Sequence, residues 1–363
     1  MRPLRWTSPA CLGLLLVLGG GTASAESLAT RTSNHGDVLV QVEAWPEDLL
    51  ELGFDVWTHH TTTRQALVRV PPQQRALLDA TGLSYSIVEP DLGPLVEAES
   101  ARLAAAARPV AGGSLDPAYY DDYRDLADVQ DRLDALISTH PERASLVEIG
   151  LSLEGRPIRG VRLSNPGPDD RPVVVVQACQ HAREWISVAA TMWAAEQLAT
   201  APVGGALDGL LDDAELVVVP VVNPDGYQYS WTNERFWRKN RREDFGVDLN
   251  RNWSVAWGGQ GASNYPYDEN YRGAAAFSEP ESTAMRDFIA ADPHARASLD
   301  VHSYGQLVLY PWGFQLDPAP DDLMLSGTSE DIAEAMGLPH GSVYIPLQSA
   351  ALYPAAGNAM DWA

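Results

Sequence analysis

Uninterrupted runs of valine and other apolar residues constrain the fold of this chain more than any other feature. "RPVVVVQAC" (171–179) and "AELVVVPVVNP" (214–224) barely alternate between apolar and polar residues. Such runs are typical of strands that are covered on both faces, as in sheets flanked by helices. "ASLVEIGLS" (144–152) and "RPIRGVRLSN" (156–165) predict further strands.

Helical segments alternate with these strands. The pattern predicts helices within residues 116–141 and 184–199, and "FSEPESTAMRDFIA" (277–290) opens with Ser278 and Glu281, a predicted capping box. Alternating strands and helices with buried strands indicate the α/β class. For residues 116–363 we therefore predict a mixed, twisted β-sheet flanked by helices on both faces.

The region before residue 116 has a different character. Residues 26–115 predict a small α+β domain of short alternating strands with helical pieces between them, ending in an Ala-rich connector near 94–116. Its position is consistent with a propeptide, and an unrelated adaptor domain is the alternative. Residues 1–25 combine Arg2 and Arg5 with a short apolar run and "TASA", which predicts a signal peptide cleaved after Ala25.

Charge, leader and cysteine content limit the partners and the location. The formal net charge is −24, which repels phosphate backbones, so we exclude nucleic acid as a partner. The apolar leader is too short to span a bilayer, so we expect a secreted protein, extracellular or periplasmic, without a stable membrane anchor. Cleavage after Ala25 leaves Cys179 as the one cysteine, either a buried apolar residue or a nucleophile.

A metal site is indicated at the end of one buried strand. His181 and Glu184 follow "RPVVVVQAC" and are three residues apart, close enough to bind one ion from a single turn. His302 in "LDVHSY" also follows an apolar, strand-like run and is the best candidate for a third ligand. Two imidazoles and a carboxylate are suitable ligands for Zn²⁺. His181 and Glu184 alone are a weak motif, equally compatible with a polar surface.

An arginine cluster follows in this otherwise acidic chain. It lies within residues 235–251 and is interleaved with tryptophan and phenylalanine: Arg235, Arg238, Arg241, Arg242 and Arg251. Enclosed guanidinium groups suit bidentate binding of a carboxylate, and Asn250 offers an amide beside Arg251. A solvated basic loop is the alternative. Zinc next to a carboxylate receptor suggests a peptidase that acts at a free C-terminus.

The order of several motifs resembles the secreted zinc carboxypeptidases of the carboxypeptidase A and B type. The matching segments, spread over residues 116–363, are "EGRPI" (154–158), "HARE" (181–184), "NPDGY" (223–227), "RFWRKNR" (235–241), "DLNRNW" (248–253), "FSEPE" (277–281) and "HSYGQLVLYPWG" (302–313). Jointly they are highly specific.

The resemblance implies a role for each motif residue. His181, Glu184 and His302 would bind one zinc ion, and Arg238 would polarise the scissile carbonyl and stabilise the oxyanion. Asn250 and Arg251 would receive the terminal carboxylate of a peptide or protein substrate. Arg183, Arg235 and Tyr304 would contact the substrate further out. Each histidine should also have a hydrogen-bond partner on the ring nitrogen that faces away from the metal, with Asp248 and Asp300 as candidates.

The chain also departs from the resemblance near its end. The resemblance implies a general-base glutamate and a mobile tyrosine after the "DW" pair of Asp361 and Trp362, and Ala363 follows that pair directly. We therefore expect an incomplete catalytic domain with weak or no activity, because loss of a general base typically costs about 10²–10⁴ in rate.

Two other functions remain open from the sequence. One is a related zinc amide hydrolase that acts on cell-wall peptides or acylated amino acids. The other is a non-catalytic protein that only binds peptide C-termini.

Overall fold

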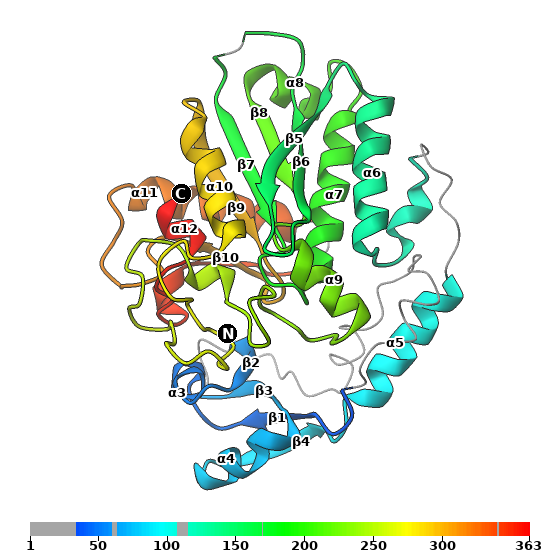
Figure 1. Cartoon of the computed structure of the whole chain (residues 1–363). Coiled ribbons are helices and arrows are strands. Elements are labelled where there is room, and N and C mark those ends of the chain that lie inside the picture. The colour runs from blue at the N-terminus through cyan, green and yellow to red at the C-terminus, as the bar shows by residue number, and fades with distance from the viewer. Residues whose placement is uncertain (1–33, 60–63, 107–114, 169, 340) are drawn as a thin grey trace.

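The structure, a computed structural model, describes residues 34–363 apart from 60–63, 107–114, 169 and 340 (Figure 1). The predicted signal peptide 1–25 lies outside the described residues. The described part contains a small N-terminal domain and a larger α/β domain. Among the described residues, no helix combines the length and the apolar character needed to cross a membrane.

A five-stranded mixed sheet forms the centre of the larger domain, which confirms the predicted fold class. The strand order is β5-β6-β8-β7-β9. Strands β6 and β5, and β6 and β8, run antiparallel, whereas β7 is parallel to both β8 and β9. The strands are β5 (Ala144–Leu151), β6 (Pro157–Leu163), β7 (Val173–Ala178), β8 (Glu215–Val219) and β9 (Ala295–Val301).

Helices cover both faces of this sheet (Figure 1). On one face α6 (Leu126–Thr139) and α7 (Trp185–Ala199) pack against it, and α10 (Pro280–Ala291) packs on the other. The valine run of β7 explains why: Val175 belongs to the hydrophobic cluster on the α10 face, and Val176 packs against the cluster on the α6–α7 face. A strand whose two faces are both buried has no polar alternation.

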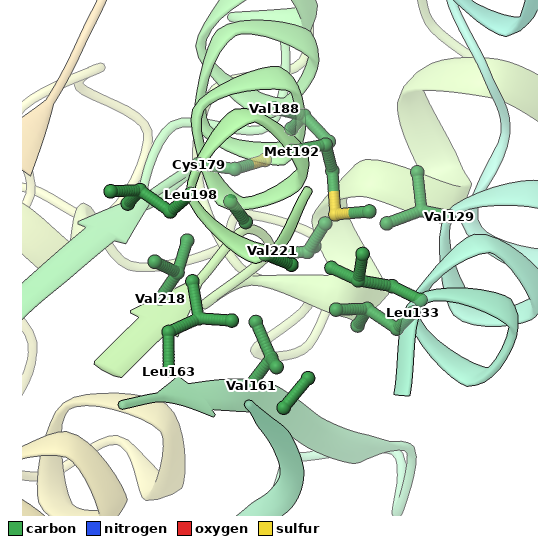
Figure 2. Close-up of a cluster of buried hydrophobic side chains, with 14 of the residues drawn as sticks. Val129, Leu133, Val161, Leu163, Cys179, Val188, Met192, Leu198, Val218 and Val221 are labelled. Atoms are coloured by element: carbon green, nitrogen blue, oxygen red, sulfur yellow. The ribbon is translucent and has the colours of Figure 1, made fainter. Parts of the chain in front are cut away.

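Figure 2 shows the cluster on the α6–α7 face. Leu133 of α6 and Met192 of α7 meet Val161 and Leu163 of β6, and all four side chains are fully buried. On the other face, Met285 of α10 joins the cluster of Leu249 and Trp253, two residues that lie on either side of Arg251 in the sequence. Packing on that face therefore fixes the segment that carries the candidate substrate residues.

Shorter elements complete the larger domain. They are η2 (Pro117–Asp121), α8 (Ala206–Asp213), α9 (Pro224–Thr232), η3 (Leu249–Arg251), β10 (Leu307–Tyr310), α11 (Asp322–Gly337), β11 (Ile345–Gln348), η4 (Ser349–Ala351) and α12 (Ala359–Trp362). Strands β10 and β11 pair in parallel as a separate two-stranded sheet.

The N-terminal domain contains the strands and helices expected from its pattern. Its antiparallel sheet has the order β2-β3-β1-β4 and its own core around Val40, Phe54 and Leu78. Its elements are β1 (Val38–Val42), α3 (Pro46–Glu51), β2 (Asp55–His59), β3 (Ala66–Val70), η1 (Pro72–Gln74), α4 (Arg75–Ala80), β4 (Tyr85–Glu89) and α5 (Gly93–Ala106). Helix α5 occupies much of the predicted connector.

The predicted capping box of α10 is wrong. The N-cap residue is Glu279, its side chain makes no capping hydrogen bond, and Pro280 is the first helical residue. Glu281 instead accepts a hydrogen bond from the backbone N–H of Leu153, 2.9 Å away in the turn between β5 and β6. Proline at the first helical position needs no N–H partner, and the carboxylate is free to serve a tertiary contact.

Candidate active site

The metal-site candidates come from the carboxyl ends of two neighbouring strands. Strands β7 and β9 are parallel, and their last residues, Ala178 and Val301, are paired. His302 directly follows β9, and His181 lies three residues after β7. Because parallel strands end at the same edge of a sheet, the two imidazoles meet there. Glu184 is the residue before α7 and points into the same space.

The three side chains converge as predicted. Nδ1 of His181 lies 2.8 Å from one carboxylate oxygen of Glu184, and Nδ1 of His302 lies 3.0 Å from the other. One ligand atom from each residue falls within 4.8 Å of the others. Ligand atoms on a tetrahedral zinc ion with bonds of about 2.1 Å lie roughly 3.4 Å apart, so a small relaxation accommodates the ion. The donor set therefore fits Zn²⁺.

Two aspartates orient the imidazoles from behind. Nε2 of His181 lies 3.1 Å from Asp248, and Nε2 of His302 lies 2.7 Å from Asp300, which also accepts a hydrogen bond from Gln180. Such carboxylates fix the ring orientation and leave the opposite nitrogen for the metal. Both aspartates are candidates from the sequence, where neither could be assigned to a particular histidine.

Buried charge keeps the carboxylates of the site ionised. Burial alone would raise the pKa of Glu184, but His181 and His302 outweigh it and hold the pKa below its usual value. For Asp248, burial is opposed chiefly by Arg238 and then by His181, so its pKa is also well below the usual value. The site thus presents deprotonated oxygen ligands and acceptors, as metal binding requires.

Arg238 is linked to the metal site through Asp248. Its Nη2 donates to Asp248 at 2.8 Å, on the oxygen that His181 does not contact. Its backbone carbonyl also accepts a hydrogen bond from Ala182, next to His181. Burial would lower the pKa of Arg238, but Asp248 and Glu184 raise it, so the guanidinium stays charged.

Asn250 lies beside the second imidazole, and Arg251 follows it in the chain. The Asn250 amide nitrogen is 3.1 Å from His302 Nε2, and its oxygen accepts from the backbone of Ala359. Arg251 is buried and donates from Nε and Nη1 to the main-chain carbonyls of Gly261 and Asn250. Among the described residues, none offers Arg251 a carboxylate within salt-bridge distance, although its charge is close enough to help lower the pKa of Asp248.

The outer arginines are bound by the N-terminal domain. Arg183 forms a two-pronged ion pair with Asp55 at 2.8 and 2.9 Å, and Arg235 pairs with Glu99 at 2.7 Å. Tyr304, two residues after His302, is about half exposed. The remaining arginines of the cluster serve other contacts: Arg241 stacks on Tyr229 and Trp237, and Arg242 pairs with Glu279.

One tyrosine near the site escaped the sequence analysis. Tyr353 lies close enough to Arg238 to contribute to the raised pKa of its guanidinium. It also lines a cavity of about 360 Å³ between α3 and the segment 258–264. No short motif surrounds it in the sequence, and only the chain path after β11 brings it to the site.

The nucleophile alternative for Cys179 finds no support in its surroundings. The thiol is fully buried, and burial raises its pKa well above the usual value. A buried thiol of this kind is a poor nucleophile because the thiolate is the reactive form.

Fold and site together define a zinc-dependent hydrolase, and a zinc carboxypeptidase domain matches residues 129–363. The chain belongs to the zinc carboxypeptidase family. It is similar to carboxypeptidase A2 of Rattus norvegicus, with 33% identity over 90% of this chain and 79% of that protein. Carboxypeptidase A1 of Homo sapiens is 32% identical over 92% of this chain and 81% of its own length.

Among solved structures, the carboxypeptidase A of Helicoverpa armigera is similar to this chain, with a TM-score of 0.80 and 30% sequence identity. The similarity covers 91% of this chain and 85% of that one. It therefore extends over the N-terminal domain as well as the α/β domain.

Proposed function

We propose that this chain is a carboxypeptidase that removes the C-terminal residue of peptides and proteins by hydrolysing the last peptide bond. The single observation that carries the proposal is the position of Arg251. Its guanidinium is buried next to the backbone of Asn250, the residue that contacts His302, and among the described residues no carboxylate lies within salt-bridge distance of it. A buried cation is costly without a counter-charge, and the terminal carboxylate of a substrate would supply one.

Arg238 and Tyr353 would contact the substrate one residue further from its C-terminus. Arg238 is held by Asp248 next to the metal ligands, so its charge is fixed where an oxyanion would develop. Tyr353 lies near Arg238 on the side of the cavity and would contact the substrate there. Zinc bound by His181, Glu184 and His302 would polarise the scissile carbonyl and lower the pKa of a water molecule.

We further propose that residues 26–115 act as an intramolecular cover. Asp55 and Glu99 of the N-terminal domain neutralise Arg183 and Arg235, the two arginines assigned to the outer part of the substrate site. An extended peptide would compete with these carboxylates for the same guanidinium groups. Export of the chain, as the leader 1–25 predicts, would fit such a latent form.

Hydrolysis of matched substrates tests the proposal. Zinc-loaded full-length protein is incubated with an N-acylated dipeptide and with its C-terminal amide, and released amino acid is measured by mass spectrometry. We expect release from the free acid only. Arg251→Met should reduce kcat/KM by about 10²-fold, because hydrogen bonds to a charged group contribute about 1.5–3 kcal/mol each. Arg296→Met, on an exposed guanidinium, is the matched control.

The same assay separates the alternative functions. Equal cleavage of the acid and the amide would contradict a carboxypeptidase and favour a related zinc amide hydrolase. Selective binding of the acid without cleavage would indicate a non-catalytic protein that binds C-termini. The weak turnover expected in the sequence analysis stays a prediction, which this measurement also tests.

A further inference from the structure

The segment 258–272, called the brace loop here, packs against the candidate substrate site. It folds back on itself: the backbone N–H of Ser263 donates to Asn270, and that of Arg272 donates to Ser263. Arg272 also donates from its side chain to Gly258 at 2.9 Å. These contacts close the loop into a compact unit, so a displacement at its tip is transmitted to its base.

Gly261 is the point where the brace loop touches Arg251. Its carbonyl accepts from Arg251 Nε at 2.8 Å and from the Asn270 side chain at 3.1 Å. Its φ is +80°, and a Cβ there would lie 1.8 Å from the carbonyl oxygen of Pro354, next to Tyr353. Only glycine fits such a position. Gly261, whose carbonyl accepts from Arg251, therefore packs tightly against the segment that carries Tyr353.

Lys239 binds the middle of the brace loop. It is the only lysine in the chain, it follows Arg238 directly, and its side chain is buried. Its ammonium donates to the main-chain carbonyls of Pro266 at 2.9 Å and Asp268 at 2.7 Å. Burial lowers its pKa, although nearby carboxylates such as Glu269 oppose this. Within the described residues, no carboxylate lies within 4 Å of this ammonium, so the loop carbonyls are its main partners.

We propose that Lys239 is a positioning residue for Arg251. Through the brace loop and the Gly261 carbonyl, it ties the Arg238 segment to the guanidinium that receives the terminal carboxylate. The two arginines would contact groups one residue apart on the substrate, so their spacing sets which bond is cut. The inference rests on the proposed role of Arg251. It assigns a function to Lys239, for which the resemblance implies no role.

A binding measurement on zinc-loaded full-length protein tests this. The probes are 3-(4-fluorophenyl)propanoic acid and its carboxamide, which differ only in the charged group. Binding of each probe is measured by ¹⁹F NMR titration. We expect Lys239→Met to weaken binding of the acid about tenfold, because small misplacements of a binding group cost up to roughly 10²-fold. Binding of the carboxamide and the zinc content should not change. Tyr265→Ser, an exposed position in the same loop, is the control.

Two further measurements test the inference if the Lys239→Met variant folds poorly. Asn270→Ser removes the second donor to the Gly261 carbonyl and should weaken the acid selectively by severalfold. Hydrogen exchange of the amides in 258–264 should accelerate in Lys239→Met and Asn270→Ser but not in Tyr265→Ser. Equal losses for acid and carboxamide, or unchanged binding and exchange, would overturn the inference.

The Arg251→Met variant separates failure of the Lys239 inference from failure of the proposed carboxylate receptor. If the wild-type protein prefers the acid and Arg251→Met abolishes that preference while Lys239→Met keeps it, the positioning role of Lys239 is wrong and the carboxylate receptor stands. If Arg251→Met leaves the preference intact, or the wild-type protein shows none, the receptor itself is wrong and the inference is overturned with it.

Discussion

Each imidazole of the metal site has its two ring nitrogens assigned by neighbouring carboxylates. Nε2 of His302 contacts Asp300, and Nδ1 faces Glu184; His181 repeats the pattern with Asp248. A proton held on Nε2 by an aspartate leaves the Nδ1 lone pair for a metal ion. The aspartates therefore determine which atom binds, although neither touches the metal.

Replacing one of these aspartates should weaken zinc binding without removing a ligand. Asp300→Asn keeps the size of the side chain but removes its charge behind His302. We expect the zinc dissociation constant to rise roughly 10–100-fold, the usual effect of losing an outer partner. Competition with a chromophoric chelator measures it. Asp134→Asn, on an exposed aspartate, is the control; similar zinc affinity in both variants would contradict the orienting role of Asp300.

The metal ligands could be predicted from the sequence, whereas the histidine that each supporting aspartate contacts could not. His181 and Glu184 are three residues apart and His302 follows an apolar run, which made them candidates, and the resemblance implied that they bind zinc. The Asp248 and Asp300 contacts depend on how the chain returns to the sheet edge. Tyr353 was missed for the same reason, since it approaches Arg238 only after the excursion through α11 and β11.

At the scale of elements, a buried carboxylate joins α10 to the sheet and to the arginine-rich segment. Glu281 accepts from the backbone of Leu153 at 2.9 Å and from Asn240 at 3.1 Å, and it is fully buried. Burial raises its pKa to about 7, although these hydrogen bonds oppose the shift. The sequence predicted α10 correctly but assigned Glu281 to a capping box, because a local motif and a tertiary contact look alike in sequence.

The raised pKa of Glu281 predicts a pH-dependent stability. A carboxyl group whose pKa is raised on folding contributes stability that is fully present below about 4.5 and is lost as the pH rises through about 7. The loss amounts to about 3 kcal/mol, at 1.36 kcal/mol per pKa unit. Urea unfolding at pH 5 and pH 8 should show this decrease in the free energy of unfolding for the wild-type protein and a much smaller one for Glu281→Gln.

Glu330→Gln, at an exposed position of α11, is the matched control for that comparison. It should follow the wild-type pH dependence. If Glu281→Gln and the control lose the same stability between the two pH values, the carboxyl group of Glu281 does not titrate in this range.

At the scale of the whole molecule, ion pairs join the N-terminal domain to the α/β domain. Asp55 bridges Arg69 of its own domain and Arg183 across the interface, and Arg69 continues to Glu234 at 2.9 Å. The sequence predicted both domains from their patterns. It could not predict their contact, because each of these charged residues is unremarkable in sequence and acquires its partner only when the domains meet.

Removing the carboxylates of this interface should free the outer arginines. In Asp55→Asn/Glu99→Gln, Arg183 and Arg235 lose their carboxylate partners in the N-terminal domain, and breaking a buried pair costs about 3–5 kcal/mol. The N-terminal domain should then separate more readily. We expect KM for a hexapeptide, which reaches the outer arginines, to fall at least tenfold relative to KM for an acylated dipeptide. Asp48→Asn/Glu97→Gln, at exposed positions of α3 and α5, should keep the wild-type ratio. A constant ratio in all three proteins would mean that the N-terminal domain does not compete with the substrate.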